Sequence, residues 1–412
     1  MQWTCALSSK ASLEAALQDV VDRASRDLGA APTLAFLFIS SAFTSEYSRI
    51  LPLMNEKLPG VPLLGCSGGG IIGMTAEGRV REAEDEVAIS LVLAHLPGVQ
   101  VQPFHVDTDR LPDLDGSPKA WSDLIGVPPE NEPCFVLLSD PFSRGIKDLL
   151  AGLDYAYFKR PKIGGVASSG LVNGSIALFV KGRMFREGTV GFALSGNVEL
   201  ETIVAQGCRP IGTPFRVLES ERNIILKMAP EDSDEISDSP LEQLQKLVQS
   251  LEEGDRELAQ TSLFVGVAQT EFKLSLGAGD FLVRNLMGYD PKVGALAVGD
   301  RIRSGQRIQF HLRDAETSAD DLRTILISSQ EQLAGSGRRS QTLGALMFAC
   351  LGRGEALYDE PNFDSQTFTE YLGAMPMAGF FCNGEIGPVG DSTYLHGFTS
   401  VFGVFRSKEA GG

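Results

Sequence analysis

Three stretches of the chain consist almost entirely of apolar residues, without the alternation of a strand that has one face in water. They are Leu34-Ala-Phe-Leu-Phe-Ile39, Phe135-Val-Leu-Leu138 and Ala345-Leu-Met-Phe-Ala-Cys350. Such apolar runs predict β-strands. Each is followed by a segment with helical spacing and then by a second apolar run that ends in glycine-rich sequence, at residues 63–70, 163–170 and 379–387. This order predicts a β-α-β-Gly-turn-β unit that is used three times.

The glycines of the second runs recur at similar distances. Gly65, Gly164 and Gly379 follow the starts of the first runs by 31, 29 and 34 residues. Glycine recurs in turns where the backbone needs a positive φ or approaches another group closely. We therefore expect the three turns to converge on pockets, which indicates binding rather than chemistry.

Other parts of the chain predict single helices and strands. Apolar residues at 13, 16, 17, 20, 21 and 28 predict an amphipathic helix over 12–28. Two β-branched runs at 87–93 and 99–104, joined through Pro97-Gly98, predict a hairpin. The Pro- and Asp-rich stretch 110–133 predicts a surface excursion.

Short strands follow, and their turns Lys181-Gly182 and Ser195-Gly196-Asn197 favour antiparallel pairing. These strands are expected at 175–180, 189–194, 199–204 and 215–218. Nearer the C-terminus we expect a helix at 241–251, strands at 261–268, 281–286, 294–298 and 307–313, and a helix introduced by Ser318-Ala-Asp-Asp321.

The acidic, apolar-poor stretch 229–235 is the best candidate domain boundary. We predict an N-terminal domain at 1–229, an acidic linker at 230–240 and a C-terminal domain at 241–412. The predicted fold class is α+β, with two domains of mixed, mainly antiparallel β-sheets covered by helices.

Composition restricts the function. The formal net charge of −17 argues against a nucleic-acid partner, because phosphate binding relies on clustered Lys and Arg. The six cysteines have no metal-binding or redox-motif spacing, and they indicate a reduced, cytoplasmic protein. No secretory signal is recognisable, and no apolar run approaches the roughly 18 residues of a membrane span. We therefore expect no integral membrane association.

Several motifs, in the same order along the chain, resemble the FIST family. They are Gly65-Cys-Ser-Gly-Gly-Gly70, Gly207-Cys-Arg-Pro-Ile-Gly212, Phe310-His-Leu-Arg-Asp314, Gly379-Phe-Phe-Cys-Asn-Gly-Glu-Ile-Gly-Pro388 and His396-Gly-Phe-Thr399. The resemblance covers roughly residues 30–405 and implies an N-terminal and a C-terminal FIST domain. It further implies a sensory, signal-transduction module that binds a small ligand, with amino acids as proposed ligands.

The resemblance leaves other functions open. Some members bind haem and sense nitric oxide, so haem is an alternative cofactor, although no cofactor is firmly predicted. Its axial ligand would come from His95, His105, His311 or His396. In other members the FIST domains follow an F-box, which suggests a protein-interaction scaffold as a further alternative. Because the chain has no recognisable output domain, we expect a separate output partner of unknown identity, and we expect a binding protein rather than an enzyme.

The first glycine turn is a candidate ligand cradle. Backbone N–H groups of Cys66, Ser67, Gly68 and Gly69 could face a polar or anionic group, and close strand packing explains the glycines equally well. Gly65-Cys-Ser-Gly-Gly69 also matches the G-x-S-x-G elbow of hydrolases. A Ser67-based hydrolase is the last-ranked alternative, because an elbow needs a helix at once and the sequence continues with Ile71-Ile72 and the acidic, soluble stretch 82–86.

Two cysteines fall at what we take as matching places in the first and third units. They are Cys66 and Cys382, and Val166 takes that place in the second unit. The valine favours core packing for both thiols, with a reactive thiol as the alternative.

Two further groups complete the predicted ligand-binding set. In the alternating strand 307–314, His311 and Arg313 either face a pocket, where Arg313 could hold a carboxylate, or lie on a solvated face. In the last motif, Asn383, Glu385 and His396 are polar groups among apolar residues. Glu385 could bind a ligand amino group and Arg353 its carboxylate, or they could form an internal pair that fixes the turn.

Overall fold

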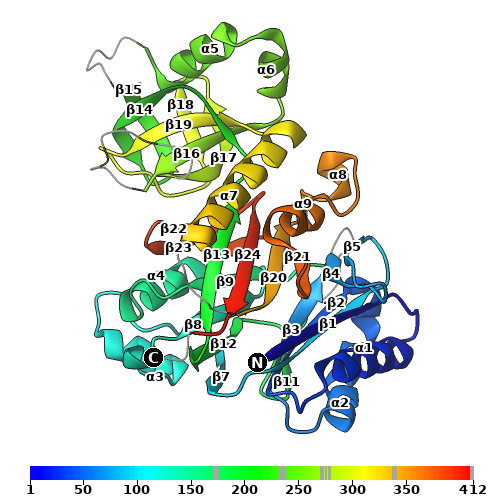
Figure 1. Cartoon of the computed structure of the whole chain (residues 1–412). Coiled ribbons are helices and arrows are strands. Elements are labelled where there is room, and N and C mark those ends of the chain that lie inside the picture. The colour runs from blue at the N-terminus through cyan, green and yellow to red at the C-terminus, as the bar shows by residue number, and fades with distance from the viewer. Residues whose placement is uncertain are drawn as a thin grey trace. The chain divides into compact units, whose positions relative to one another are not determined.

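The computed structural model of the chain (Figure 1) describes residues 1–169, 176–231, 238–269, 273, 276, 280–335 and 341–408, the last three residues of the 280–335 segment by their backbone only. The chain forms two compact units. Unit 1 comprises Met1–Ala205 and Arg323–Gly412, and unit 2 comprises Gln206–Leu322.

Unit 1 contains three six-stranded sheets. In sheet order, the first is β1 (Gln2–Ser8), β6 (Ile89–His95), β2 (Leu34–Ser40), β3 (Leu63–Gly68), β10 (Leu178–Val180) and β11 (Arg183–Phe185). The second is β7 (Val99–Val106), β12 (Thr189–Gly196), β8 (Cys134–Ser139), β9 (Lys162–Val166), β22 (Glu385–Val389) and β23 (Ser392–His396). The third is β13 (Glu199–Ala205), β24 (Ser400–Arg406), β20 (Thr342–Cys350), β21 (Met377–Cys382), β4 (Gly70–Met74) and β5 (Val80–Glu84).

The three sheets share one strand order. Each has a central parallel pair, β2–β3, β8–β9 or β20–β21, with antiparallel pairing elsewhere, so the predicted mixed, mainly antiparallel α+β fold is confirmed. The hairpin after each pair joins another sheet: β4–β5 the third, β10–β11 the first and β22–β23 the second. Each hairpin is thus hydrogen-bonded to a sheet other than that of the strand pair before it, and these bonds connect the three sheets. The predicted sequence repeat stays a prediction; the shared feature is the strand order.

Because both halves of the chain contribute strands to the same sheets, unit 1 is discontinuous in sequence. β13, which precedes unit 2, pairs with β24, which follows it. The predicted linear division at 230–240 therefore differs from the division into compact units. Residues 232–237 of that linker lie outside the described residues, and as a division into sequence domains the boundary stays a prediction.

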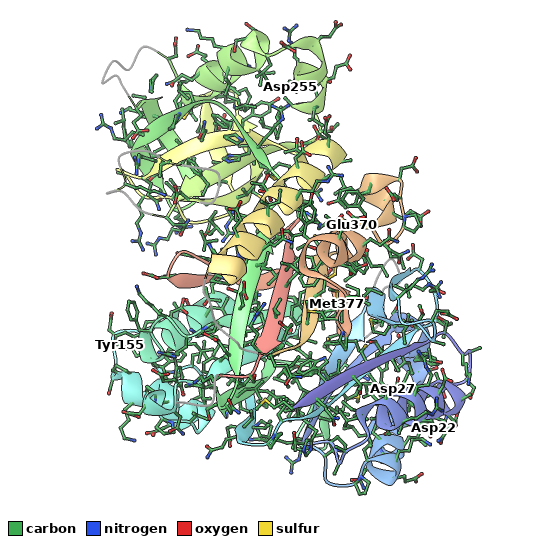
Figure 2. All side chains as sticks on the ribbon, in the orientation of Figure 1. Asp22, Asp27, Tyr155, Asp255, Glu370 and Met377 are labelled. Carbon is green, nitrogen blue, oxygen red and sulfur yellow. The ribbon has the colours of Figure 1, made fainter. Side chains whose placement is uncertain are left out.

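Helices cover the outer faces of the sheets, and two of them, α1 and α2, pack against the first sheet (Figure 1). The helical elements of unit 1 are α1 (Leu13–Leu28), η1 (Ser41–Glu46), α2 (Tyr47–Lys57), α3 (Pro118–Ile125), η2 (Pro129–Asn131), α4 (Ile146–Ala156), the part of α7 (Ala315–Gly335) from Arg323 onward, α8 (Glu355–Tyr358) and α9 (Phe363–Leu372). Helix α1 confirms the predicted stripe: the Ser12 side chain accepts a hydrogen bond from Ala15 N, and Gly29 ends the helix at φ 62°. Asp22 and Asp27 lie on its solvent side (Figure 2).

The inner faces of the sheets share one core. Phe38 of the first sheet stacks on Phe380 of the third at 5.4 Å between ring centroids, and Phe36 meets Phe192 of the second at 5.5 Å. The strand β2 is buried along its whole length, between this core and the helix-covered face. Burial on both sides explains the unbroken apolar run.

Some sequence predictions of local pairing are wrong. The runs 87–93 and 99–104 do not form a hairpin, because β6 pairs with β1 and β2 whereas β7 pairs with β12. Pro97-Gly98 instead carries the chain from the first sheet to the second. The stretch 110–133 contains α3, whose Trp121 is fully buried. The turn Lys181-Gly182 does join an antiparallel pair, as predicted. The strands on either side of Ser195-Gly196-Asn197, β12 and β13, belong to different sheets, so the predicted pairing across that turn is wrong.

Unit 2 is a closed barrel with helices beside it. Its strand order is β14 (Arg209–Glu221), β15 (Ile224–Pro230), β18 (Ala295–Val298), β17 (Phe281–Asp290), β16 (Leu263–Ala268) and β19 (Arg307–Leu312), and its helices are α5 (Pro240–Ser250), α6 (Glu253–Leu258) and the start of α7 (Ala315–Gly335). Helix α7 begins before the predicted Ser318, because the Asp314 carboxylate accepts a hydrogen bond from Thr317 N at 2.7 Å. No helix in the described residues has the length and apolar content to cross a membrane.

Candidate functional site

The carboxyl ends of β3, β9 and β21 meet in unit 1. Ser168 N donates to the Ser67 carbonyl at 3.3 Å, and the Ser168 hydroxyl accepts from Gly69 N at 2.8 Å. The same hydroxyl donates to the Phe381 carbonyl. Asn383 Nδ2 donates to the Ala167 carbonyl at 3.3 Å. We call Ser67, Gly69, Ala167, Ser168, Phe381 and Asn383 the strand-end junction.

The glycines of the strands that lead to the junction allow close packing. A Cβ on Gly68 would lie 2.7 Å from Phe380 Cβ, and one on Gly165 would lie 2.3 Å from Cys382 Sγ. The repeated glycines lie inside strands: a Cβ on Gly164 or Gly379 would lie 1.8 or 1.7 Å from a carbonyl oxygen of the parallel neighbour. Glycine is needed here because two backbones approach each other.

Cys66 and Cys382 are buried, and burial raises the pKa of both thiols well above the usual value. Core packing, the favoured interpretation, agrees with this environment. Their predicted equivalence is wrong, however. The glycines that oppose Leu37 and Met347 are Gly65 and Gly379, and the two cysteines follow these by one and by three residues.

Ser67 does not lie on a hydrolase elbow. Its side chain is fully buried on β3, and its hydroxyl accepts from Ala177 N at 3.2 Å. The next element is strand β4, which begins at Gly70. An elbow requires a helix in that place.

Arg353 already holds a carboxylate, that of Asp364. The two fully buried side chains form a bidentate pair, with Nε–Oδ2 at 2.6 Å and Nη2–Oδ1 at 2.8 Å. The Tyr358 hydroxyl contacts both, and Ser400 Oγ donates to Asp364 at 2.8 Å. Arg353 and Ser400 lower the pKa of Asp364 against the effect of burial. The guanidinium is therefore occupied by the protein itself.

Glu385 and His396 are direct cross-strand partners and both are buried. Glu385 Oε2 accepts from Thr399 N at 3.1 Å, and His396 Nε2 lies 3.0 Å from the Gly387 carbonyl. The structure thus places the seven predicted residues of the first and last motifs near the strand ends, and these are Cys66, Ser67, Gly68, Gly69, Asn383, Glu385 and His396. As a ligand-binding set, together with Arg353, they stay a prediction.

Two acidic residues near the Arg353–Asp364 pair were not predicted from the sequence as buried or functional residues. Glu82 Oε1 accepts from Ser365 N at 2.8 Å, and Glu84 Oε1 accepts from Glu355 N at 3.0 Å. Glu82 is only 5% exposed, so the expected soluble acidic stretch is wrong at this position. Burial, and then the Asp364 carboxylate, raise the pKa of Glu82 to about 8. Its partners lie some 280 residues away, and no local signal marks them.

His311 and Arg313 belong to unit 2 and are described apart from the other predicted residues. Both are buried, so a solvated strand face is wrong. His311 Nδ1 lies 3.0 Å from the Gln309 carbonyl, and the ring packs edge-on against Phe281. Burial lowers the pKa of His311 to about 4, which makes the imidazole neutral.

A neutral imidazole is the expected haem ligand. However, no histidine lines any of the four pockets that are described below. The described residues of these pockets do not fit a haem, and we derive no function through one.

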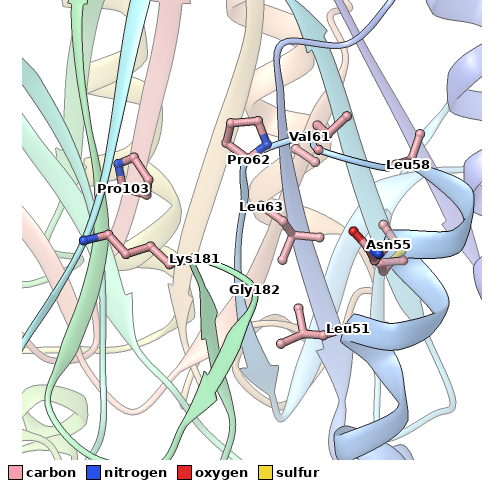
Figure 3. Close-up of a pocket in the computed structure, with 12 residues that line it drawn as sticks. Leu51, Asn55, Leu58, Val61, Pro62, Leu63, Pro103, Lys181 and Gly182 are labelled. Carbon is pink, nitrogen blue, oxygen red and sulfur yellow. The ribbon is translucent and has the colours of Figure 1, made fainter.

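A pocket of about 300 Å³ opens on unit 1 between α2, the start of β3, β7 and the turn between β10 and β11 (Figure 3). Its lining is mainly apolar, and it comprises Ala35, Leu51, Met54, Asn55, Leu58, Gly60, Val61, Pro62, Leu63, Pro103, Lys181 and Gly182. None of these residues belongs to the ligand-binding set predicted from the sequence.

Two polar side chains lie on opposite sides of this pocket, Lys181 beside Pro103 and Asn55 beside Leu58 (Figure 3). In the described part of the chain, neither makes a hydrogen bond or an ion pair. Lys181 has a left-handed backbone at φ 52°, which is uncommon for a residue with a long side chain. Both residues are exposed to solvent, so the pocket combines apolar walls with one solvent-accessible ammonium and one solvent-accessible amide.

Two other pockets of unit 1 have linings with more charged residues. A groove of about 590 Å³ beside β13 contains Lys159, Arg160 and Arg406, each of which is ion-paired. A pocket of about 330 Å³ beside α1 contains Arg23, which donates to the carbonyls of Leu7 and Met74. It also contains Arg26 and Asp27, whose side chains make no hydrogen bond or ion pair in the described residues. The pocket of Figure 3 is the better candidate for a small ligand.

Comparison with known proteins places the chain in a family. Residues 33–231 match the model of the FIST N domain and residues 240–388 that of the FIST C domain. An uncharacterized Mycobacterium tuberculosis protein, Rv0628c, is 32% identical over 377 residues, which cover 92% of each chain. Human F-box only protein 22 is 35% identical over 119 residues, 25% of this chain and 29% of that protein. The chain belongs to the FIST family and carries a FIST N domain followed by a FIST C domain.

Proposed function

We propose that this chain is a sensory protein whose small ligand occupies the pocket of Figure 3. FIST domains are associated in general with sensory and signal-transduction roles. The observation that carries the proposal is the combination of apolar walls with two polar side chains that have no partner in the described residues. Ligand sites commonly combine an apolar lining with a few convergent polar groups.

The lining favours a small molecule with an apolar body and a carboxylate. The ammonium of Lys181 is suited to a carboxylate, and the Asn55 carbonyl oxygen can accept a hydrogen bond from an amino group. The walls formed by Leu51, Leu58 and Leu63 suit an aliphatic side chain. Aliphatic amino acids are therefore the first ligands to test.

The pocket also suggests how binding is transmitted. A ligand between α2 and the β10–β11 turn contacts two segments that are far apart in sequence. At the base of that hairpin, Ser67 N donates to the Ala177 carbonyl at 2.9 Å and Ala177 N donates to Ser67 Oγ. A ligand that favours one hairpin position shifts the population of conformers and alters the strand-end junction. A separate output protein reads that change.

Calorimetric titration of the full chain tests the proposal. The probes are leucine, 4-methylpentanoate and its neutral amide. We expect both carboxylates to bind and the amide to bind more weakly. Leu58→Trp should abolish binding by filling the pocket, and Lys181→Gln should weaken carboxylate binding about tenfold, the equivalent of 1.4 kcal/mol. The exposed Lys119→Gln is the matched control and should leave the affinity unchanged.

Two outcomes would overturn the proposal: none of the probes binds, or binding survives Leu58→Trp. Binding that survives Leu58→Trp and is lost in Glu385→Gln would move the ligand to the predicted set at the strand ends. Circular dichroism of each variant establishes that the fold is retained.

A further inference from the structure

Unit 2 has an apolar groove between its helices and its barrel. The groove has a volume of about 470 Å³, and its apolar lining comes from three elements and the chain between them. The residues that form its floor are Leu241, Leu244, Val248, Leu263, Leu286 and Tyr289. Apart from Leu244, none of these floor residues is fully buried. Unit 2 thus leaves part of its hydrophobic surface open to solvent.

Exposed apolar residues continue beyond the groove. Tyr289 is 63% exposed, and its neighbour Met287 is 65% exposed. A contiguous apolar surface of this kind marks an interaction site more often than scattered single residues do.

The geometry of the groove suits a helix. Leu241, Leu244 and Val248 lie at i, i+3 and i+7 on α5, so one face of this helix forms a wall. Seven residues of helix extend about 10 Å. A partner helix laid along the wall presents its own apolar residues at the same spacing.

The chain that connects Gln249 to Ala259, both in the lining of the groove, is acidic, and this charge indicates the kind of partner. Between residues 238 and 260 the chain has six carboxylates and two cations. Glu252, Glu253 and Glu257, at the start of α6 and within it, form no ion pair in the described residues. Asp255, on the same helix, is labelled in Figure 2 and pairs with Arg209. An acidic rim favours a cationic partner and disfavours an acidic one.

We infer that this groove binds an amphipathic helix of a partner protein, with apolar residues in the groove and Lys or Arg beside α6. The inference is independent of the ligand pocket, which lies in unit 1. It assigns unit 2 a surface through which the expected output partner can be bound.

Fluorescence anisotropy with the full chain tests the inference. The probe is a labelled 14-residue Leu/Lys peptide with leucines at i, i+3, i+4 and i+7, and the control peptide has the same composition in scrambled order. We expect micromolar binding of the amphipathic peptide and at least tenfold weaker binding of the scrambled one. Val248→Glu should weaken binding at least tenfold, whereas Val293→Glu, an exposed valine outside the groove, should not.

The acidic rim has its own test. The triple change Glu252→Gln, Glu253→Gln and Glu257→Gln should weaken binding and reduce its dependence on salt. Equal binding of the two peptides, or equal effects of the two valine variants, would overturn the inference, because it would show attraction to charge alone. Sedimentation provides a further check: a wild-type dimer that Val248→Glu dissociates would assign the groove to self-association and would also overturn it.

Discussion

The strand-end junction and the pocket of Figure 3 are two regions of the same unit, and they differ in what their polar groups do. At the junction and beside it, Ser168, Asn383 and Arg353 donate to groups of the protein itself. In the pocket, Lys181 and Asn55 have no partner in the described residues. Polar groups that are bonded internally stabilise a fold, whereas unengaged groups in a hollow are available to a ligand.

The comparison also teaches what a glycine motif signals. The glycines that stand out in the sequence allow strands and aromatic rings to approach each other. The residues that line the pocket come from several helices, strands and turns. They do not form a sequence motif. A conspicuous motif can therefore mark a structural joint rather than a binding site.

The largest effect is expected at the buried ion pair. Arg353→Met leaves the Asp364 carboxylate buried without its cation and should lower the free energy of unfolding by about 3–5 kcal/mol. The exposed Arg49→Met should lower it by less than about 1 kcal/mol. Chemical denaturation measures both. A small stability loss with a complete loss of ligand affinity would instead make Arg353 a ligand-binding residue and would break the comparison.

Adding one methyl group tests the packing role of the glycines. In Gly379→Ala the new Cβ collides with the Met347 carbonyl oxygen, and we expect a loss of about 1–3 kcal/mol or more. Gly397→Ala places its Cβ in open space and should change stability by less than about 0.5 kcal/mol. Equal stabilities of the two variants would refute the packing explanation.

Glu82 predicts a dependence of stability on pH. Its carboxyl group ionises near pH 4.5 in the unfolded chain and near pH 8 in the folded one. Because the folded chain holds this proton more tightly, the protonated carboxyl contributes to the free energy of unfolding. This contribution is fully present below pH 4.5 and is lost as the pH rises through 8. Relative to Glu82→Gln, the wild type should lose on the order of 1–3 kcal/mol across this window. Denaturation between pH 5 and 8 measures the difference, with the exposed Glu130→Gln as control; parallel wild-type and Glu82→Gln curves would contradict the account.

The smallest effect is expected at the pocket itself. Lys181 adopts a left-handed backbone that glycine adopts without strain, so Lys181→Gly should stabilise the fold by about 1 kcal/mol and weaken ligand binding. Arg222, at φ 55° in another turn, supplies the control: Arg222→Gly should stabilise similarly and leave binding intact. Thermal unfolding and titration measure the two properties. A Lys181→Gly variant that binds normally would exclude the ammonium from the site.

The features that could be predicted from the sequence are local ones. The amphipathic stripe of α1, the apolar run of β2 and the turn at Lys181-Gly182 follow from neighbouring residues. The exchange of hairpins among the sheets could not be predicted, because β4 and β21 pair across some 300 residues. For the same reason the sequence predicts a solvated Glu82, whereas in the structure Glu82 N donates to Asn362 Oδ1 and the Glu82 carboxylate accepts from Ser365 N.

Hydrogen exchange of the full chain, with and without a saturating aliphatic amino acid, tests the central claim most directly. We predict slower exchange in α2, in the following residues 58–63 and in the β10–β11 turn, with smaller changes at Ser67. Slower exchange confined to residues 350–385, with none in α2 or the turn, would show that the ligand binds at the strand ends and would contradict the account.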